Sequence, residues 1–251
     1  MMDVHSYWSL YGWGTTDWSS YLEGTNDDIK APHCNRRDDN KLYPPTSYRQ
    51  WIQDLKSAGG SNREVALLEW GISPSTNSAS SKAPSRLQMA TIATDILMQL
   101  INSELDAACY WPLRVDDPNS EFLNRTLFDM DNKQTVIWKY LQFFKEIKGY
   151  DLLETSIGAT KAGVLAAKNK AGTKIIVYIL RRGEGSLNIL IKDLDESFFP
   201  SSAKAVSYYA PNGDTYVDDS VWSSPTTTID TATSQISLTV RGWSLTRVIL
   251  Q

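Results

Sequence analysis

The sequence holds few residues of the kinds that build metal sites and disulfide frameworks. Two Cys and two His occur among its 251 residues. Cys34 lies in a polar loop and Cys109 in an apolar run, and neither belongs to a zinc-ligand or disulfide pattern. His5 and His33 cannot anchor a His-rich metal site. We therefore expect two free cysteines, no metal and no other cofactor.

Several further classes of protein are excluded by what the chain lacks. No stretch approaches the roughly 18 apolar residues that a membrane span requires. The opening residues 1–5 lack the basic start and apolar run of a secretory signal. The formal net charge is −4, and the 25 Lys and Arg residues are spread along the chain. We expect neither nucleic acid nor a membrane surface as a partner.

Strand and helix patterns alternate three times in residues 1–149. Strands are predicted over 3–8, 65–70 and 107–111, and apolar residues at helical spacing follow each strand in 48–58, 89–100 and 137–144. Glycines at 59–60 and 149 suit the left-handed ends of helices. A long loop rich in Gly, Asp, Asn and Pro runs to residue 45. This order predicts right-handed crossovers and a parallel sheet.

From about residue 150 the pattern changes to short strands separated by turn clusters. Clear candidates are 174–180, 186–191, 203–209, 235–240 and 245–250, and a blurred one covers 162–167. Short strands at this spacing are typical of an antiparallel β-sandwich. The predicted fold class is therefore α/β in residues 1–149 followed by all-β in residues 150–251.

One carboxylate stands out as a candidate catalytic group. Glu69 lies near the end of the otherwise apolar segment Val65–Trp70. A buried, ionised Glu without partners costs several kcal/mol, so its presence there needs a reason. Active sites of parallel α/β proteins assemble at the carboxyl ends of the strands. The alternative is a Glu that merely emerges from the strand end into solvent.

The other two strands of this half also end in residues suited to a site. In the first strand, Asp3, His5 and Tyr7 alternate onto one face and could form a polar wall beside a carboxylate. In the third, Trp111 lies at the strand end. A structural histidine and a buried packing indole are the simpler explanations of His5 and Trp111.

Taken together, the three strand ends resemble those of a known clan of enzymes. They read His5-Ser6-Tyr7-Trp8, Leu67-Leu68-Glu69-Trp70-Gly71 and Cys109-Tyr110-Trp111. In this order, followed by a helix and a sandwich, they are similar to the last three β/α units of retaining (β/α)8-barrel glycoside hydrolases. The resemblance is to the arabinofuranosidase, xylosidase, glucuronoxylanase and agarase families. It implies a partial TIM-like barrel over 1–149 and a C-terminal β-sandwich over 150–251.

The resemblance also implies roles and a substrate class. Glu69 corresponds to the nucleophile, and Tyr7 corresponds to a residue that hydrogen-bonds the nucleophile. His5, on the same strand as Tyr7, is a further candidate catalytic residue. The implied substrate is a poly- or oligosaccharide. A full-length relative would be secreted or periplasmic. Residues implied to bind sugar are the aromatic ones at Trp111, Trp8, Trp13, Trp18 and Trp70.

The sequence departs from this clan in one essential respect. Retaining hydrolysis needs a second carboxyl group about 5 Å from the first, and in this clan it is the Glu of an Asn-Glu pair on an earlier strand. No Glu in this sequence follows an Asn, and no strand precedes Asp3. We expect an incomplete hydrolase with little or no turnover. The alternatives are a carbohydrate-binding protein without catalysis, or a half-barrel completed by another copy or by a missing N-terminal half.

Overall fold

The computed structural model describes residues 2–8, 30–31, 46–60, 64–72, 86–103, 105–118, 120, 125–159, 161–183, 185–192, 198, 200–209, 222–230 and 235–251. In 2–8, 30–31 and 46–47, and at 86, 88 and 222, it describes the backbone and not the side chains. Of the predicted site residues, Trp13 and Trp18 lie outside the described residues, as does Cys34.

The first half of the chain forms a parallel sheet with helices between its strands. Strands β1 (Met2–Trp8), β4 (Val65–Ile72) and β5 (Ala107–Tyr110) pair in parallel in the order β1-β4-β5. Helix α2 (Tyr48–Gly59) precedes β4, α3 (Arg86–Asn102) precedes β5, and α4 (Val136–Gln142) with the 3₁₀ helix η4 (Phe143–Ile147) follows. Short strands β2 (Lys30–Ala31) and β3 (Thr46–Ser47) pair with each other. The predicted alternation and parallel pairing are confirmed.

The helices lie where their sequence pattern predicts, although α3 begins three residues earlier and ends two later than expected, and η4 extends the third helical segment to Ile147. Tyr48 and Ile52, one turn apart on α2, are both 0% exposed, so the apolar stripe of this helix faces the core. Gly60 follows the helix with φ 86°, and Gly149 follows η4 with φ 80°. Both glycines adopt the left-handed conformation that other residues rarely tolerate, which ends each helix.

The second half forms two antiparallel sheets. The larger has the order β11-β10-β14-β8-β7-β6 and the smaller β12-β13-β9 among the described strands. The C-terminal strand β14 lies inside the larger sheet, paired with β10 on one side and β8 on the other. The strands are β6 (Asp151–Leu153), β7 (Ala162–Lys168), β8 (Ile175–Arg181), β9 (Leu187–Ile191), β10 (Ala203–Tyr209), β11 (Trp222–Ser223), β12 (Thr227–Asp230), β13 (Gln235–Val240) and β14 (Ser244–Leu250).

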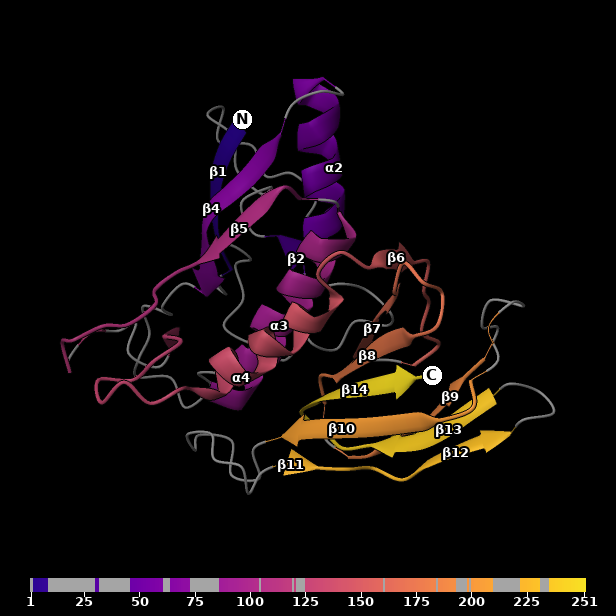
Figure 1. Ribbon diagram of the computed structural model, residues 1–251. Helices are drawn as coiled ribbons and strands as arrows, with labels where there is room; N and C mark the ends of the chain where they lie inside the picture. The colour runs from indigo at the N-terminus through magenta and orange to yellow at the C-terminus, as the bar shows by residue number, and fades with distance from the viewer. Residues whose placement is uncertain are drawn as a thin grey trace.

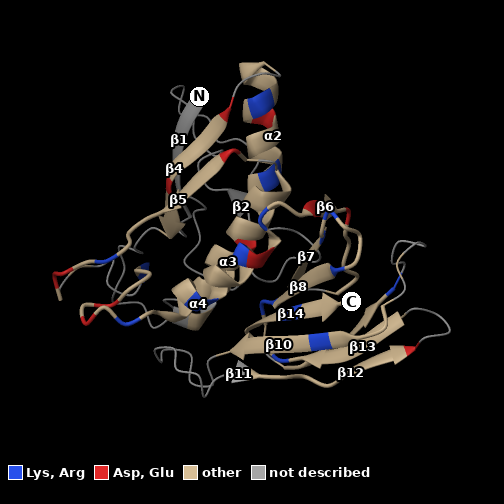
Figure 2. Ribbon diagram, viewed as in Figure 1, with Lys and Arg blue, Asp and Glu red and all other residues tan. Residues whose placement is uncertain are grey.

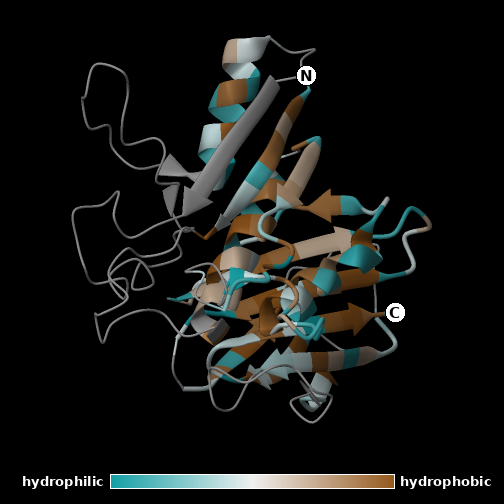
Figure 3. Ribbon diagram, turned by 90° about the vertical axis from the view of Figure 1, so that its left-hand side faces the viewer, coloured by the Kyte–Doolittle hydropathy of each residue, from teal (hydrophilic) through white to brown (hydrophobic). Residues whose placement is uncertain are grey.

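The central strands of the larger antiparallel sheet lie between the helices and the smaller sheet (Figure 1). Leu165, Tyr178 and Leu180 face the helices, in a cluster that also contains Ile96 of α3 and Leu67 of β4. The alternate residues of β7 and β8 face the smaller sheet in a second cluster. Figure 3 shows the strand that ends at the C-terminus brown near that end, among other brown strands. Both faces of β7 carry apolar side chains, with Leu165 and Ala167 in the first cluster and Val164 and Ala166 in the second, which explains why this strand lacks a clean alternation.

The helix-side core does not stop at residue 150. The same cluster joins side chains of β4 and α2–α4 with side chains of β7, β8, β10 and β14. Lys, Arg, Asp and Glu lie mainly in loops and near the ends of elements (Figure 2). None of the helices in the described part of the chain has the length and apolar character needed to cross a membrane.

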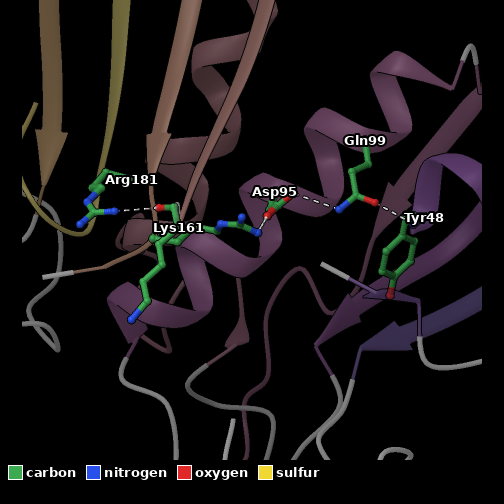
Figure 4. A network of polar contacts seen from close by, with 6 residues as sticks. Tyr48, Asp95, Gln99, Lys161 and Arg181 are labelled. Atoms are coloured by element: carbon green, nitrogen blue, oxygen red, sulfur yellow. Dashed lines mark hydrogen bonds and ion pairs between the residues drawn. The ribbon is translucent and has the colours of Figure 1, made fainter. Parts of the chain in front are cut away.

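A buried polar network runs through the helix layer (Figure 4). The Arg182 guanidinium, just after β8, donates to Asp95 Oδ2 of α3. Asp95 Oδ1 accepts a hydrogen bond from Gln99 Nε2 at 3.0 Å, and Gln99 Oε1 accepts one from the backbone N–H of Tyr48 at 2.7 Å. The network therefore links the larger antiparallel sheet to α3 and to the first residue of α2.

Candidate active site

The centre of the candidate site is a β-bulge in β4. Along β1, Val4 and His5 are consecutive, but their partners on β4 are Leu67 and Glu69. Along β5, Ala108 and Tyr110 are two residues apart, and their partners Leu67 and Trp70 are three apart. The middle strand therefore has one residue more than each neighbour between 67 and 70. Bulges of this kind are frequent beside active sites, where they redirect a side chain.

The bulge decides which side chains of β4 reach the core. In a regular strand Leu67 and Glu69 would share a face and Trp70 would lie on the other. Leu67 is 0% and Trp70 2% exposed, and both belong to the helix-side cluster. Between them, Leu68 is 41% exposed and Glu69 is partly exposed. The carboxylate is thereby kept out of the apolar layer between sheet and helices, where its ionised form would be costly.

Strand β1 brings two of the predicted residues level with this bulge. His5 is the direct Cα partner of Glu69, Tyr7 is the partner of Gly71, and Trp8 that of Ile72. Of the two residues expected beside the carboxylate, His5 is thus at the level of Glu69, and Tyr7 is two residues nearer the carboxyl end of the sheet.

Trp70, expected from the resemblance to bind sugar, instead packs inside the protein. Its ring meets the ring of Tyr110 edge to face, with centroids 4.9 Å apart. The Tyr110 hydroxyl donates to the Arg125 carbonyl oxygen at 2.9 Å. Burial raises the pKa of Tyr110 well above its ordinary value, although the charge of Arg125 opposes this. The sequence analysis gave Tyr110 no role. In the structure Tyr110 packs against Trp70, the residue of β4 that follows Glu69.

Trp111 lies at the open end of the sheet. Its backbone N–H donates to the Trp70 carbonyl oxygen at 2.8 Å, which continues the β4–β5 pairing by one residue. The residue is 38% exposed, and Leu113 two residues later is 58% exposed. An indole held by its backbone and open to solvent is the arrangement that suits stacking on a sugar ring.

Two other carboxylates described near β4 and β5 accept hydrogen bonds from the backbone. Asp106 precedes β5, at the opposite end of the sheet from Glu69, and accepts from the backbone N–H of Val65 at 2.8 Å. Asp129 accepts from the backbone N–H of Lys133 at 2.7 Å in the loop before α4. Cys109 on β5 is free and exposed. Across the ranges that the structure describes, no group of three or more His, Cys, Asp or Glu is placed to hold a metal ion.

Comparison by sequence finds no match: no family model matches the chain, and no curated protein matches it. Comparison of structures does find similar folds. An arabinofuranosidase of family GH51 from Xanthomonas axonopodis pv. citri aligns with 99% of this chain and 52% of its own, at a TM-score of 0.62 and 11% identity.

Two further structures with similar folds are named as enzymes of other activities. A GH30 endoxylanase from Clostridium papyrosolvens C71 aligns with 85% of this chain and 50% of its own, at a TM-score of 0.55 and 13% identity. CelM2, a bifunctional glucanase-xylanase from a metagenome library, aligns with 100% of this chain and 43% of its own, at a TM-score of 0.56 and 14% identity.

These similar structures are (β/α)8-barrel glycoside hydrolases, so the resemblance inferred from the three strand ends is confirmed. At such identities the likeness establishes the fold. The chain spans about half the length of the solved structures it matches, between 41% and 52% of each of them.

Proposed function

We propose that this chain is the nucleophile-bearing part of a retaining glycoside hydrolase that acts on poly- or oligosaccharides. Residues 1–149 would be three β/α units of the barrel and residues 150–251 a β-sandwich. The observation that supports it best is the position of Glu69, partly exposed in a bulge of the middle parallel strand while Leu67 and Trp70 on either side are buried. Similarity of fold to xylanases and arabinofuranosidases supports the substrate class.

The chemistry would be double displacement. A Glu69 oxygen attacks the anomeric carbon, the bond from that carbon to the leaving oxygen breaks, and a glycosyl ester on Glu69 results; water then hydrolyses the ester. His5 and Tyr7, carried by the adjacent strand, would orient the carboxylate. Trp111 would stack on the sugar beside it, with Trp8, Trp13 and Trp18 as further candidates for contact.

The reaction also needs an acid/base carboxyl that this sequence does not offer in the clan's pattern. Protonation of an ordinary sugar leaving group depends on that second group, about 5 Å from the nucleophile. We therefore propose that the 251-residue chain hydrolyses glycosides slowly or not at all. The second carboxyl would come from an N-terminal barrel half supplied by a further polypeptide segment.

An activated, trapped substrate tests the nucleophile without the acid. In 2,4-dinitrophenyl 2-deoxy-2-fluoroglycosides the phenolate leaves without protonation, and the fluorine slows hydrolysis of the ester. We expect the xyloside or arabinofuranoside to add one glycosyl unit to the intact mass, with the modified peptide containing Glu69. Glu69→Gln is the matched control and should stay unmodified.

One outcome would contradict the role of Glu69 as nucleophile, and another would contradict the incompleteness of the hydrolase. Labelling of Glu69→Gln to the same extent as the parent chain, or no labelling by any reagent of the series, would remove Glu69 as the nucleophile. Rapid turnover of aryl glycosides that disappears in Glu69→Gln would confirm the nucleophile and refute the incompleteness.

A non-catalytic carbohydrate-binding role is the second candidate, and the exposure of Trp111 favours it. Titration with xylo- and arabino-oligosaccharides, followed by tryptophan fluorescence, should give a saturable change that Trp111→Ala abolishes. Saturable binding together with failure of Glu69 to react with any fluoroglycoside would select this role over the hydrolase fragment.

A further inference from the structure

A cavity opens between the two antiparallel sheets, far from the bulge in sequence and built from different elements. Its volume is about 680 Å³. The floor consists of aliphatic side chains of β7 and β8 that point toward the smaller sheet, namely Val164, Ala166, Ile175, Val177 and Ile179. One wall is β9 and the other is the segment 153–159. We call this cavity the inter-sheet slot.

The slot lies where the smaller sheet stops short of the larger one. Thr227 Oγ1 of β12 donates to the Ala203 carbonyl oxygen of β10 at 2.8 Å, so β12 lies over β10. In the smaller sheet β9 pairs with β13 on the side away from β12, so it lies at the other edge of that sheet. In the larger sheet β14, β8, β7 and β6 follow β10 in that order, and side chains of β7 and β8 line the slot beside β9. The slot is therefore the next strand position beyond β9.

Both walls of the slot present backbone that forms no ladder toward it. Strand β9 pairs with β13 along one edge, and no described strand pairs with its other edge. On the opposite wall, Leu153, Thr155 and Ile157 are partly buried and alternate with exposed residues, which is the exposure pattern of a strand. Within the described residues, 154–158 make no backbone–backbone hydrogen bond. Backbone N–H and C=O groups at a sheet edge are a template for another strand.

The residues that line the slot indicate which class of molecule can bind there. No aromatic residue of the described part of the chain lines the slot, unlike sites that stack sugars. An alkyl chain could cover the aliphatic floor, but it would leave the peptide groups of both walls without partners. An extended peptide satisfies both requirements at once, because its side chains alternate between floor and solvent while its backbone pairs sideways.

Charge and chain length agree with a peptide occupant. Among the described residues of the lining, the charged ones are Glu154 on one wall and Lys192 at the end of the other, so a complementary strand is apolar in its middle and carries charges toward its ends. The solved structures that match the chain have about half their length beyond the matched part, which is ample polypeptide to supply one strand.

We propose that the inter-sheet slot binds one extended peptide segment with aliphatic side chains at alternate positions, which adds a strand to the free edge of β9. The proposal does not depend on Glu69 being catalytic, because no residue of the slot takes part in that site.

The test uses the 251-residue chain and a synthetic probe. The probe is a ten-residue acetylated peptide with lysine at one end, glutamate at the other, and threonine and valine alternating between them, labelled for fluorescence anisotropy. We expect saturable binding, and slower hydrogen exchange of backbone amides in 154–158 and 187–191 when the peptide is bound. Exchange is measured on the unchanged chain, so this readout does not depend on any variant folding.

A matched pair of variants locates the site. Ile157→Lys places a charge in the wall of the slot and should weaken peptide binding by about tenfold or more. Leu152→Lys puts the same side chain on an exposed residue of β6 that does not line the slot, 40% exposed, and should leave binding unchanged. Equal effects of the two variants would overturn the assignment.

Other occupants are distinguished by the same measurements. Dodecanoate is titrated in parallel as an alkyl-chain probe. Binding of dodecanoate with failure of the peptide to bind, or failure of both to bind, would overturn the proposal. So would peptide binding that protects amides only outside 154–158 and 187–191.

Discussion

Arg182 and Asp95 form an ion pair that water scarcely reaches. Their side chains are 1% and 6% exposed, and they come from the end of β8 and the middle of α3. The pair joins the antiparallel part of the chain to the helix layer that supports β4. Because Asp95 also accepts from Gln99, and Gln99 accepts from the N–H of Tyr48, the position of α2 depends on the same contacts.

Removing one member of this pair should destabilise the protein strongly. In Asp95→Ala, the guanidinium of Arg182 stays buried without its counter-charge, and we expect a loss of about 3–5 kcal/mol in the free energy of unfolding, measured by urea denaturation. The double variant Asp95→Leu with Arg182→Met should recover much of that loss. A double variant as unstable as Asp95→Ala would show that the charge left behind is not the cause.

The exposed pair of Lys133 and Asp131 is the matched control. Its side chains are 67% and 75% exposed. Asp131→Ala should cost less than about 1 kcal/mol, because solvent already screens both charges.

The two tryptophans beside Glu69 should respond to mutation in opposite ways. Trp70→Ala removes a buried ring from the core and should lower the free energy of unfolding by about 3–5 kcal/mol. Trp111→Ala removes an exposed ring and should change it by less than about 1 kcal/mol. Thermal unfolding of the two variants under one set of conditions gives the order; a less stable Trp111→Ala would contradict the assignment of Trp70 to the core and Trp111 to the surface.

Alkaline pH should unfold the protein through its buried tyrosines. Burial raises the pKa of Tyr110, Tyr140 and Tyr178 above the ordinary value of 10.0. Their stabilising contribution is complete below pH 10 and is lost above it, because the unfolded chain then releases phenolic protons that the folded chain retains. Stability should fall by about 1.4 kcal/mol per pH unit for each tyrosine affected.

Absorbance at 295 nm during a pH titration checks this. We expect the buried tyrosines to ionise together with the loss of ellipticity. Smooth ionisation of all the tyrosines near pH 10 while the fold persists would be inconsistent with their burial.

Two tyrosine hydroxyls connect the parts of the chain on either side of residue 150. Tyr178 on β8 donates to the Phe143 carbonyl oxygen at 2.8 Å, and Tyr140 on α4 donates to the Trp243 carbonyl oxygen at 2.9 Å. Replacing either by Phe should cost about 1–3 kcal/mol, because a carbonyl loses its partner. Since the core is shared, we also expect near-UV and far-UV circular dichroism to report one common urea transition; two separated transitions would mean that the parts unfold independently.

The elements with a strong period were predictable from the sequence. The expected strand over 65–70 is β4, the helical pattern over 89–100 lies within α3, and the strand over 174–180 is β8, with ends that differ by one to three residues. Each reflects apolar spacing that the chain carries locally. Strand β12 was not singled out, because its short run Thr227–Asp230 alternates between partly buried and exposed residues and contains one large aliphatic side chain.

The bulge and the shared core were not predictable in the same way. A bulge is a mismatch between three strands, and nothing within Leu67–Trp70 distinguishes it from a regular strand, so Trp70 was expected at the site and lies in the core instead. The change of pattern near residue 150 marks where helices give way to strands. It does not mark where the packing stops, because Leu180 and Tyr178 fill the layer under α3.

The place of β14 in its sheet sets the order in which the protein can be made. Residues 244–250 lie between β10 and β8, so among the described strands β11 and β10 cannot hydrogen-bond into the rest of that sheet until these residues are synthesised. During translation the parallel strands and their helices would leave the ribosome with the sheet that covers them still divided. Part of the helix layer therefore stays uncovered until β14 is in place, and an apolar surface left open in this way during folding is prone to aggregate.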